Sequence, residues 1–488
     1  MIQLVKKLFE PLDLSKGSIW KVILWFSVPI LLSYLFQQVY TIADAAICGQ
    51  FLNSNQVAGV NNTGNIVFIV LQFAFGCTAG FSVVTANRIG KKDMAGVKQS
   101  LAVQILLCLL ISVILTIVAC LCVNPLLALI GLKPSENPVQ NEIYQSAYRY
   151  VFIIFIGTAA QIYYNLICSF LRSIGDSLTP LLFLIFSTLL NIVLDLLFIA
   201  GWKMGVEGAA IATVIAQAVS AVSCFVYTFY RYKEYRLGLN DFSWQTKAVL
   251  KHLKLGLPLA FQFSILAIGL IVVQAVIVQF DTSLSGEVVV SYAQNGFGAA
   301  TKLNNFLMCP FNALGTAMLS FCGQNAGANQ TKRIKKGVTQ ALLIVLVEYV
   351  VFAGVGLLLT LNGFYLYIFY SPDKINAQTI HYGNIYLYCD LGLYFILGFL
   401  FVFRNALQGV GRALFPFLAG IGELVGRIAV CLILPTAING GPISTEAKPE
   451  ALIGLAFADP LAWLFAVLLM LYGVVFYIYK RKDTPLKY

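Results

Sequence analysis

Long apolar stretches separated by short polar loops recur along almost the whole chain. Each stretch is at least as long as the ~20 residues that an α-helix needs to cross the hydrocarbon core of a bilayer. The pattern therefore predicts about twelve transmembrane helices with polar sequence confined to the loops and ends. The predicted spans are 20–48, 57–87, 95–123, 146–170, 178–201, 206–230, 250–280, 288–322, 337–361, 380–403, 413–438 and 451–479.

The composition indicates a chain that uses the bilayer as its solvent. Of the 488 residues, 59% are hydrophobic and 11% are charged, whereas about 25% are charged in ordinary soluble domains. A soluble fold could not bury so much apolar surface, so the predicted fold class is an all-α polytopic membrane protein. The segment Met1–Lys16 is polar and is not followed by the pattern of a cleavable signal.

Lysine and arginine are concentrated in alternate loops, which predicts the orientation of the chain. The net charge is +11, but the basic residues form no separate domain that would indicate a nucleic-acid partner. Because cytoplasmic loops carry the excess of lysine and arginine, we expect a multi-pass protein of the cell membrane with both termini cytoplasmic. The loops that decide this carry Lys6, Lys7, Lys16 and Lys21; Arg88, Lys91, Lys92 and Lys98; Arg231, Lys233, Arg236, Lys247, Lys251 and Lys254; Lys332, Arg333, Lys335 and Lys336; and Lys480, Arg481, Lys482 and Lys487.

The two halves of the chain repeat each other. The matched pairs are Leu171/Leu407, Gly175/Gly411, Leu178/Leu414, Pro180/Pro416 and Leu182/Leu418 at an offset of 236 residues, Gly90/Gly327 and Lys98/Lys335 at 237, Pro29/Pro258 at 229, and Gly208/Gly454 at 246. Six crossings per repeat give both halves the same orientation, so a pseudo-twofold axis along the membrane normal should relate them. We predict a cytoplasmic segment 1–19, an N-terminal lobe 20–230, a cytoplasmic linker 231–250, a C-terminal lobe 251–479 and a cytoplasmic tail 480–488.

Several motifs, in this order and with this repetition, resemble one transporter family. They are PILLSYLFQQVYTIADAAICGQ, ANRIGKKD and its repeat GQNAGANQ, LRSIGDSLTP, NIVLDLLFIAGWKMGVEGAAIATVIAQ and ALQGVGRALFP. The chain resembles multidrug and toxic compound extrusion (MATE) transporters, in particular their prokaryotic DinF-like branch. The resemblance covers essentially the whole chain. It implies a twelve-helix fold of two six-helix lobes and a secondary antiporter that expels mostly cationic, amphipathic organic compounds in exchange for Na⁺ or H⁺.

Two carboxylates inside the predicted spans are candidates for ion coupling. An acid in hydrocarbon needs a partner or a function. Helical spacing puts Asp44 on one face of the first span with Gln37 and Tyr40. The same spacing pairs Asn191 with Asp195 and Thr213 with Gln217. Their oxygen atoms suit Na⁺, and close carboxylates cannot both ionise cheaply, so the set could equally hold a proton. The alternative is that the two acids only stabilise the lobe.

The resemblance assigns this set a role in the first half alone. In the DinF-like branch the coupling site uses a first-helix acid, an Asn-x-x-x-Asp pair and a sixth-helix Thr, and these positions fall on Asp44, Asn191, Asp195 and Thr213. At the repeat offsets the second half has Val273, Arg427, Cys431 and Asp459 instead.

We therefore predict a structural ion pair between Arg427 and Asp459, shared by Glu423 one turn from Arg427. The competing interpretation makes Asp459 a second coupling acid. Lys302, in the middle of a span, could face a central cavity or pair with an acid such as Glu348 or Asp390, and the pair is favoured because unpaired charge is costly.

Other functional classes find less support in the sequence. A lipid-linked glycan flippase of the same superfamily is the nearest rival, but such proteins usually carry extra helices or a strongly cationic cavity. An enzyme would need a catalytic constellation, whereas His252 and His381 belong to no motif and no Walker lysine motif indicates ATP-driven transport. A channel would not need a two-lobe repeat. We expect a monomer with a small organic substrate, lipid neighbours and no cofactor beyond Na⁺ or H⁺ as the coupling ion.

Overall fold

The structure, a computed structural model, describes residues 10–243, 245–370 and 375–480, and these residues are almost entirely helical. The main helices are α2 Ile19–Phe51, α3 Ser54–Gly90, α4 Met94–Leu121, α5 Val123–Leu129, α6 Pro138–Ile156, α7 Thr158–Ser173, α8 Leu178–Asp195, α9 Val206–Arg231, α10 Thr246–Gln279, α11 Tyr292–Leu307, α12 Cys309–Gly327, α13 Thr331–Thr360, α14 Leu366–Phe369, α15 Ala377–Gly392, α16 Tyr394–Gly409, α17 Leu414–Asn439, α18 Pro449–Ala456 and α19 Ala458–Val474.

Nine of the described helical segments are long and apolar enough to cross a membrane, and three bent helix pairs bring the number to as many as twelve. The first helix begins at Ile19, close to the expected Trp20. The bent pairs are α6/α7 at 47°, α11/α12 at 41° and α15/α16 at 53°. The predicted count of spans is thus met, although the sequence pattern read each bent pair as one continuous helix.

Two of the three breaks coincide with a glycine or a proline. Between α6 and α7 lies Gly157, where a Cβ atom would come within 2.2 Å of the Val214 side chain, so α9 approaches the chain too closely for a larger residue. Between α11 and α12, Pro310 occupies the first turn of α12, a position where its missing N–H costs no helical bond.

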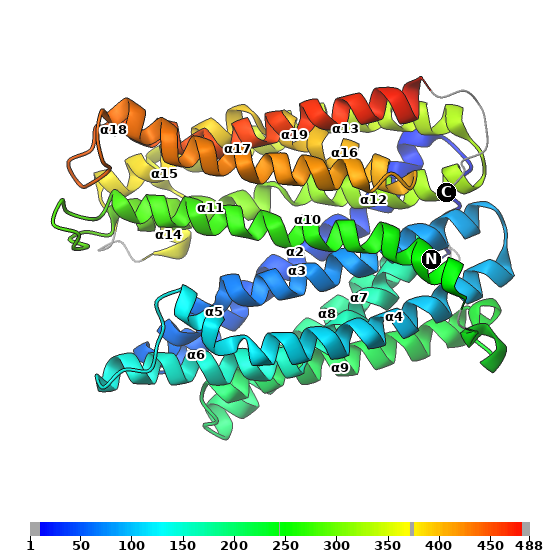
Figure 1. Cartoon of the computed structure of the whole chain (residues 1–488), viewed down its shortest axis with the longest axis horizontal. Helices are drawn as coiled ribbons and strands as arrows, with labels where there is room; N and C mark the ends of the chain where they lie inside the picture. The colour runs from blue at the N-terminus through cyan, green and yellow to red at the C-terminus, as the bar shows by residue number, and fades with distance from the viewer. Residues whose placement is uncertain (1–9, 244, 371–374, 481–488) are drawn as a thin grey trace.

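The helices α4 to α9 of the first half and α13 to α19 of the second pack mainly within their own half, whereas α3 packs most extensively on α10, and α12 packs on α2 and α3 as well as on α16. Figure 1 shows these two groups as the lower and upper parts of the view, with α2, α3, α10 and α11 running between them. The helix α2 joins the groups because its beginning packs on α12 and its later part on α8.

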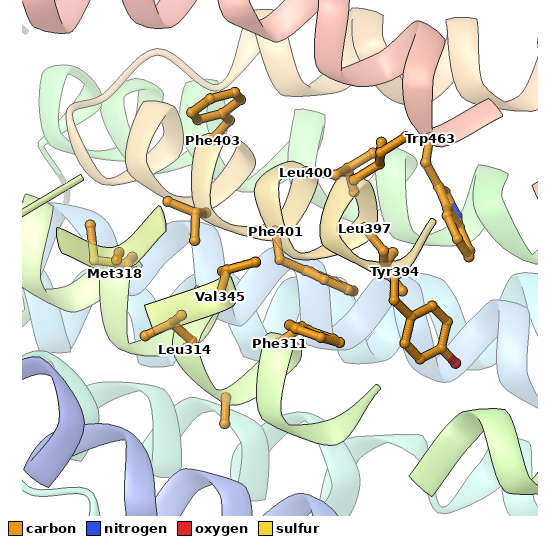
Figure 2. Packing of buried hydrophobic residues seen from close by; sticks show 14 of the residues in the cluster. Phe311, Leu314, Met318, Val345, Tyr394, Leu397, Leu400, Phe401, Phe403 and Trp463 are labelled. Atoms are coloured by element: carbon orange, nitrogen blue, oxygen red, sulfur yellow. The ribbon is translucent and has the colours of Figure 1, made fainter. Parts of the chain in front are cut away.

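The second half has the largest apolar core, shown in part in Figure 2. Phe311 and Leu314 of α12 face Leu397 and Phe401 of α16 there. The ring of Tyr394 lies edge-on to that of Phe311, with 5.8 Å between the centroids. Because α12 is buried along its whole length, from Cys309 to Gly327, this core fixes the position of α12 against the other half.

At one end of the molecule the two halves touch backbone to backbone, in a contact that we call the seam. It joins Asn87–Gly90 of α3 to Gln324–Ala328 at the end of α12. A Cβ atom on Gly90 would lie 1.9 Å from the Gln324 carbonyl oxygen, and one on Gly327 would lie 2.0 Å from that of Asn87. These two glycines are the matched pair of the sequence repeat, so the seam is symmetric, and only glycine permits its close approach.

The orientation of the chain gives a testable topology. The two ends of the described part of the chain both lie beside the first turns of α13. Arg333 donates there to the Lys16 carbonyl oxygen, and the Thr339 hydroxyl bonds to the Tyr479 hydroxyl. In a cysteine-free background we expect Lys233→Cys and Gln330→Cys to react with a membrane-impermeant maleimide only from the cytoplasmic side. Lys133→Cys, in the loop between α5 and α6, is expected to react only from outside. Reaction of Lys233→Cys or Gln330→Cys from outside would contradict the topology.

Candidate functional site

Asp44 of α2 and Asp195 at the end of α8 lie together in the first half. Their carboxyl groups lie close enough to interact directly. The remaining oxygen of each, Oδ1, is buried and has no hydrogen-bond partner among the described residues. Carboxylates only accept hydrogen bonds, so a bond between two of them requires one shared proton. The pair, which we call the two-acid site, therefore presents a proton position and two unsatisfied oxygen atoms.

Neutral polar side chains complete the site from α2, α8 and α9. The Thr213 hydroxyl lies 3.4 Å from the Tyr40 hydroxyl and 3.4 Å from Nδ2 of Asn191. With the Asn191 amide turned over, its nitrogen donates to Asp195 Oδ2 at 3.0 Å and its oxygen accepts from the Thr213 backbone N–H at 3.3 Å. Asn191 thus connects Asp195 to Thr213, and the structure brings together Asp44, Asn191, Asp195, Thr213 and Tyr40.

Two predicted supporting residues do not join this group through any contact shown among the described residues. The side chain of Gln37 is exposed. Oε1 of Gln217 is buried without a hydrogen-bond partner in the described part of the chain. Helical spacing places both residues on the expected faces of their helices. A helix face carries more side chains than one site includes, and the packing of the neighbouring helix decides which of them meet.

The helix changes form directly after Asp195. Residues Leu196–Gly201 form a π-helical turn, and such wider turns recur at functional sites because they shift the backbone hydrogen bonds by one residue. The π-helical turn changes the direction of the segment that follows Asp195. Ile199 of this turn packs in a small apolar cluster with Cys48 and Leu52.

Sequence reasoning missed two neighbours of the acids. Tyr150 of α6 and Cys48 of α2 both interact electrostatically with Asp44 and Asp195. Cys48 follows Asp44 by four residues, so helical spacing could have found it. Tyr150 comes from a helix whose position relative to α2 no sequence pattern shows.

The second half has a network of charges at the corresponding place. Nε of Arg427 is 2.6 Å from Oδ1 of Asp459, and its Nη2 is 3.2 Å from Oε1 of Glu423. The structure thus brings together all three predicted members. Arg404 of α16, which the sequence did not indicate, lies 2.7 Å from Oε2 of Glu423. These four residues, the second-half ion network, are at most 7% exposed and balance two positive charges with two negative ones.

Packing around the network shows why it can be buried. The Tyr386 hydroxyl donates to Asp459 Oδ2 at 2.8 Å. On α10, a Cβ atom at Gly269 would lie 2.9 Å from Cδ of Arg427, so the glycine leaves room for the arginine. The corresponding pair of the first half, Asn191 and Thr213, is neutral. Related positions of the repeat therefore have different chemistry.

The expected ion pair of Lys302 is wrong for the described residues. Asp390 instead accepts a hydrogen bond from Asn304 at 2.6 Å, and Oε2 of Glu348 is buried without a partner there. Nζ of Lys302 lies over the rings of Phe369 and Tyr370, 5.3 and 6.0 Å from their centroids. The short α14 brings these rings to the lysine, and no sequence pattern had suggested that contact.

Exposed polar side chains gather on the central helices. The mid-helix exposed residues of α4, α8, α13 and α19 are large and apolar, as expected of surfaces that face lipid. In contrast, the four helices between the two groups also expose amides, hydroxyls and one amine. These residues are Gln37 and Thr41 of α2, Asn61 and Asn65 of α3, Gln274 of α10, and Lys302 and Asn305 of α11. Asn65 reaches Gln274 across the two halves at 3.5 Å.

Comparison with known proteins assigns this architecture to a family. The family model MatE matches residues 29–197 and 264–433, one match in each half. The chain belongs to the MatE family. It is thus a multi-pass membrane transporter of the MATE type, and each matched range lies within one half of the chain.

Named relatives match between two thirds and nearly all of this MATE chain. The Probable multidrug resistance protein YpnP of Bacillus subtilis is 30% identical over 66% of this chain and 68% of its own length. Probable multidrug resistance protein YoeA of the same organism is 27% identical over 96% of each chain. A protein of Shewanella oneidensis named FAD transporter is 24% identical over 97% of each.

Solved structures show the same fold. A crystal structure of MATE in complex with MaL6 superposes with a TM-score of 0.82 at 21% identity, over 96% of this chain and 99% of that one. An outward-facing multidrug resistance MATE transporter of the MOP superfamily superposes with a TM-score of 0.81 at 22% identity, over 97% and 99%. The predicted MATE/MOP-type fold is therefore confirmed.

Proposed function

We propose that this MATE protein is a secondary active multidrug efflux antiporter. It exports amphipathic, mostly cationic organic compounds in exchange for H⁺ or Na⁺ by alternating access. The observation that carries the proposal is the proximity of Asp44 and Asp195, because a buried acid and a half-buried one placed together need a shared proton or cation. Relatives whose names say multidrug resistance support the efflux role.

The two-acid site offers a simple exchange. With one proton held, the carboxyl pair is bonded and carries a single negative charge, and Asn191 and Thr213 stabilise it with neutral dipoles. Loss of that proton leaves two adjacent carboxylates, which repel unless Na⁺ lies between them. The pair therefore changes geometry with ion occupancy. Because α2 packs on α12 at its beginning and on α8 near Asp195, such a change can move one half relative to the other.

The proposal also covers the two lobes of the protein, its oligomeric state and its place in the membrane. Residues 20–230 and 251–479 act as two lobes, with α10 beginning at Thr246 inside the segment first assigned to the linker. The protein works as a monomer in the cell membrane with cytoplasmic termini. The polar side chains of α2, α3, α10 and α11 line the route of the substrate. The coupling ion acts at Asp44, Asn191, Asp195 and Thr213.

Transport by purified protein in liposomes tests the function directly. We expect export of ethidium, a cationic dye, when either a pH gradient or a Na⁺ gradient is imposed alone, and the effective gradient identifies the coupling ion. FAD serves as a second probe, since one relative is named for it. Transport that neither gradient accelerates would contradict antiport. Gradient-independent scrambling of a lipid-linked glycan would instead support the flippase alternative.

A further inference from the structure

The segment Leu12–Gly17, which precedes α2, crosses the seam and binds both halves of the protein. We call it the N-terminal strap. Its side toward the first half is held at the turn between α7 and α8, where the Leu12 N–H donates to the Gly175 carbonyl oxygen at 3.0 Å. A Cβ atom on Gly175 would lie 2.1 Å from the Leu12 carbonyl oxygen, and the φ of Gly175 is +94°. This contact therefore requires a glycine.

On the other side the strap is fixed to the second half by more bonds. The Leu14 N–H donates to Oε1 of Gln324 at 3.1 Å, and Nδ2 of Asn325 donates to the Leu14 carbonyl oxygen at 3.1 Å. Arg333 of α13 donates to the carbonyl oxygens of Lys16 at 2.6 Å and Gly17 at 2.7 Å. The Leu14 side chain is fully buried, in the core cluster of the second half.

One residue of the seam joins the strap to both halves at once. Gln324 lies at the end of α12, and while its Oε1 accepts from the strap, its Nε2 donates to the Ser173 carbonyl oxygen of α7 at 2.8 Å. The Gln324 carbonyl oxygen is also the atom that Gly90 of α3 approaches. Separation of the halves at this end would break the bonds to Gly175 and Ser173 together, whereas the strap could move as one body with α12 and α13.

From this geometry we infer that the N-terminal strap is a latch that holds the seam closed and must release from Gly175 and Ser173 each time the transporter opens on that side. The inference rests on the proposed alternating access for its role in the cycle. Its position is also significant because the strap leads directly into α2, which carries Asp44. A displacement of α2 that follows ion exchange at the two-acid site is thereby transmitted to the latch.

The sequence repeat supplies a matched control for a test. Gly175→Ala places a methyl group against the Leu12 carbonyl oxygen and should detach the strap from the first half. Gly411→Ala changes the repeat-related glycine, whose φ is +81°, at a turn that makes no hydrogen bond to the strap among the described residues. Arg333→Gln removes the strongest bonds to the second half, and Arg412→Gln, whose guanidinium lies over the Tyr477 ring, is its control.

The readout is maleimide labelling of Ala86→Cys, a position 1% exposed beneath the seam, in the cysteine-free full-length protein in membrane vesicles. We expect Gly175→Ala and Arg333→Gln each to raise the labelling rate from the strap side by about tenfold, the factor expected when hydrogen bonds of ordinary strength are lost. Neither control should raise it by more than about twofold, because neither residue bonds to the strap among the described residues.

Two outcomes would overturn the latch. Labelling that rises equally in Gly411→Ala shows general strain, and labelling that does not rise in Gly175→Ala or Arg333→Gln shows that the strap does not hold the seam. Size-exclusion profiles and melting temperatures establish that each variant is folded. Because labelling needs no substrate or gradient, a failed latch is distinguishable from a failed antiporter, which would show itself only in the liposome assay.

Discussion

Asp44→Asn and Asp195→Asn are each expected to reduce gradient-driven export to the level of protein-free liposomes while the protein stays folded. The physical reason is the shared proton. An asparagine amide can donate to the remaining carboxylate, so each variant keeps the hydrogen bond between α2 and α8 and imitates the protonated pair permanently. The site can then no longer exchange its proton, or bind Na⁺ between two carboxylates.

The measurement is ethidium export driven by an imposed pH or Na⁺ gradient, together with ethidium binding to the detergent-purified variants. Glu348→Gln is the matched control, since it removes another half-buried carboxyl group within a transmembrane helix and should leave export unchanged. Normal export by either aspartate variant would exclude that residue as a coupling acid. Failure of both variants to assemble would support the alternative that the acids only stabilise the first half.

Asp459→Asn is expected to lower stability and abundance far more than it alters the ion dependence of transport. The substitution leaves Arg404 and Arg427 balanced by Glu423 alone, an uncompensated buried charge. Loss of one partner of a buried ion pair commonly costs about 3–5 kcal/mol. We therefore expect a clear fall in the melting temperature of the detergent-purified protein and in its yield from membranes.

A double substitution that copies the neutral residues of the first half should compensate for the loss of the Asp459 charge. In Arg427→Asn combined with Asp459→Thr, the second half acquires the neutral pair that Asn191 and Thr213 form in the first. The double variant leaves Arg404 paired with Glu423, so it should recover much of the stability that Asp459→Asn loses. The reverse pattern for Asp459→Asn, normal abundance with altered ion dependence, would favour Asp459 as a second coupling acid and count against a purely structural pair.

The sequence repeat located most of the second-half ion network, but not all of it. The repeat offsets of 236 and 246 residues placed Arg427 and Asp459 at the positions of Asn191 and Thr213, and those positions are close neighbours in both halves. Glu423 was found through helical spacing. Arg404 was missed because it belongs to α16, whose packing against α17 no spacing along the chain expresses. For the same reason Lys302 was assigned an acidic partner, while the structure places it over the rings of Phe369 and Tyr370.

The sequence by itself determined the all-helical membrane class, the approximate spans, the twofold repeat and the identity of the paired acids. Lipid leaves a helix as the only way for an isolated segment to satisfy its backbone, so apolar length alone reveals a span. Tertiary structure alone decided the contact of Asp44 with Asp195, the seam at Gly90 and Gly327, and the path of the strap. These depend on close approach between helices distant in sequence, which is fixed by side-chain volume and packing rather than by any local periodicity.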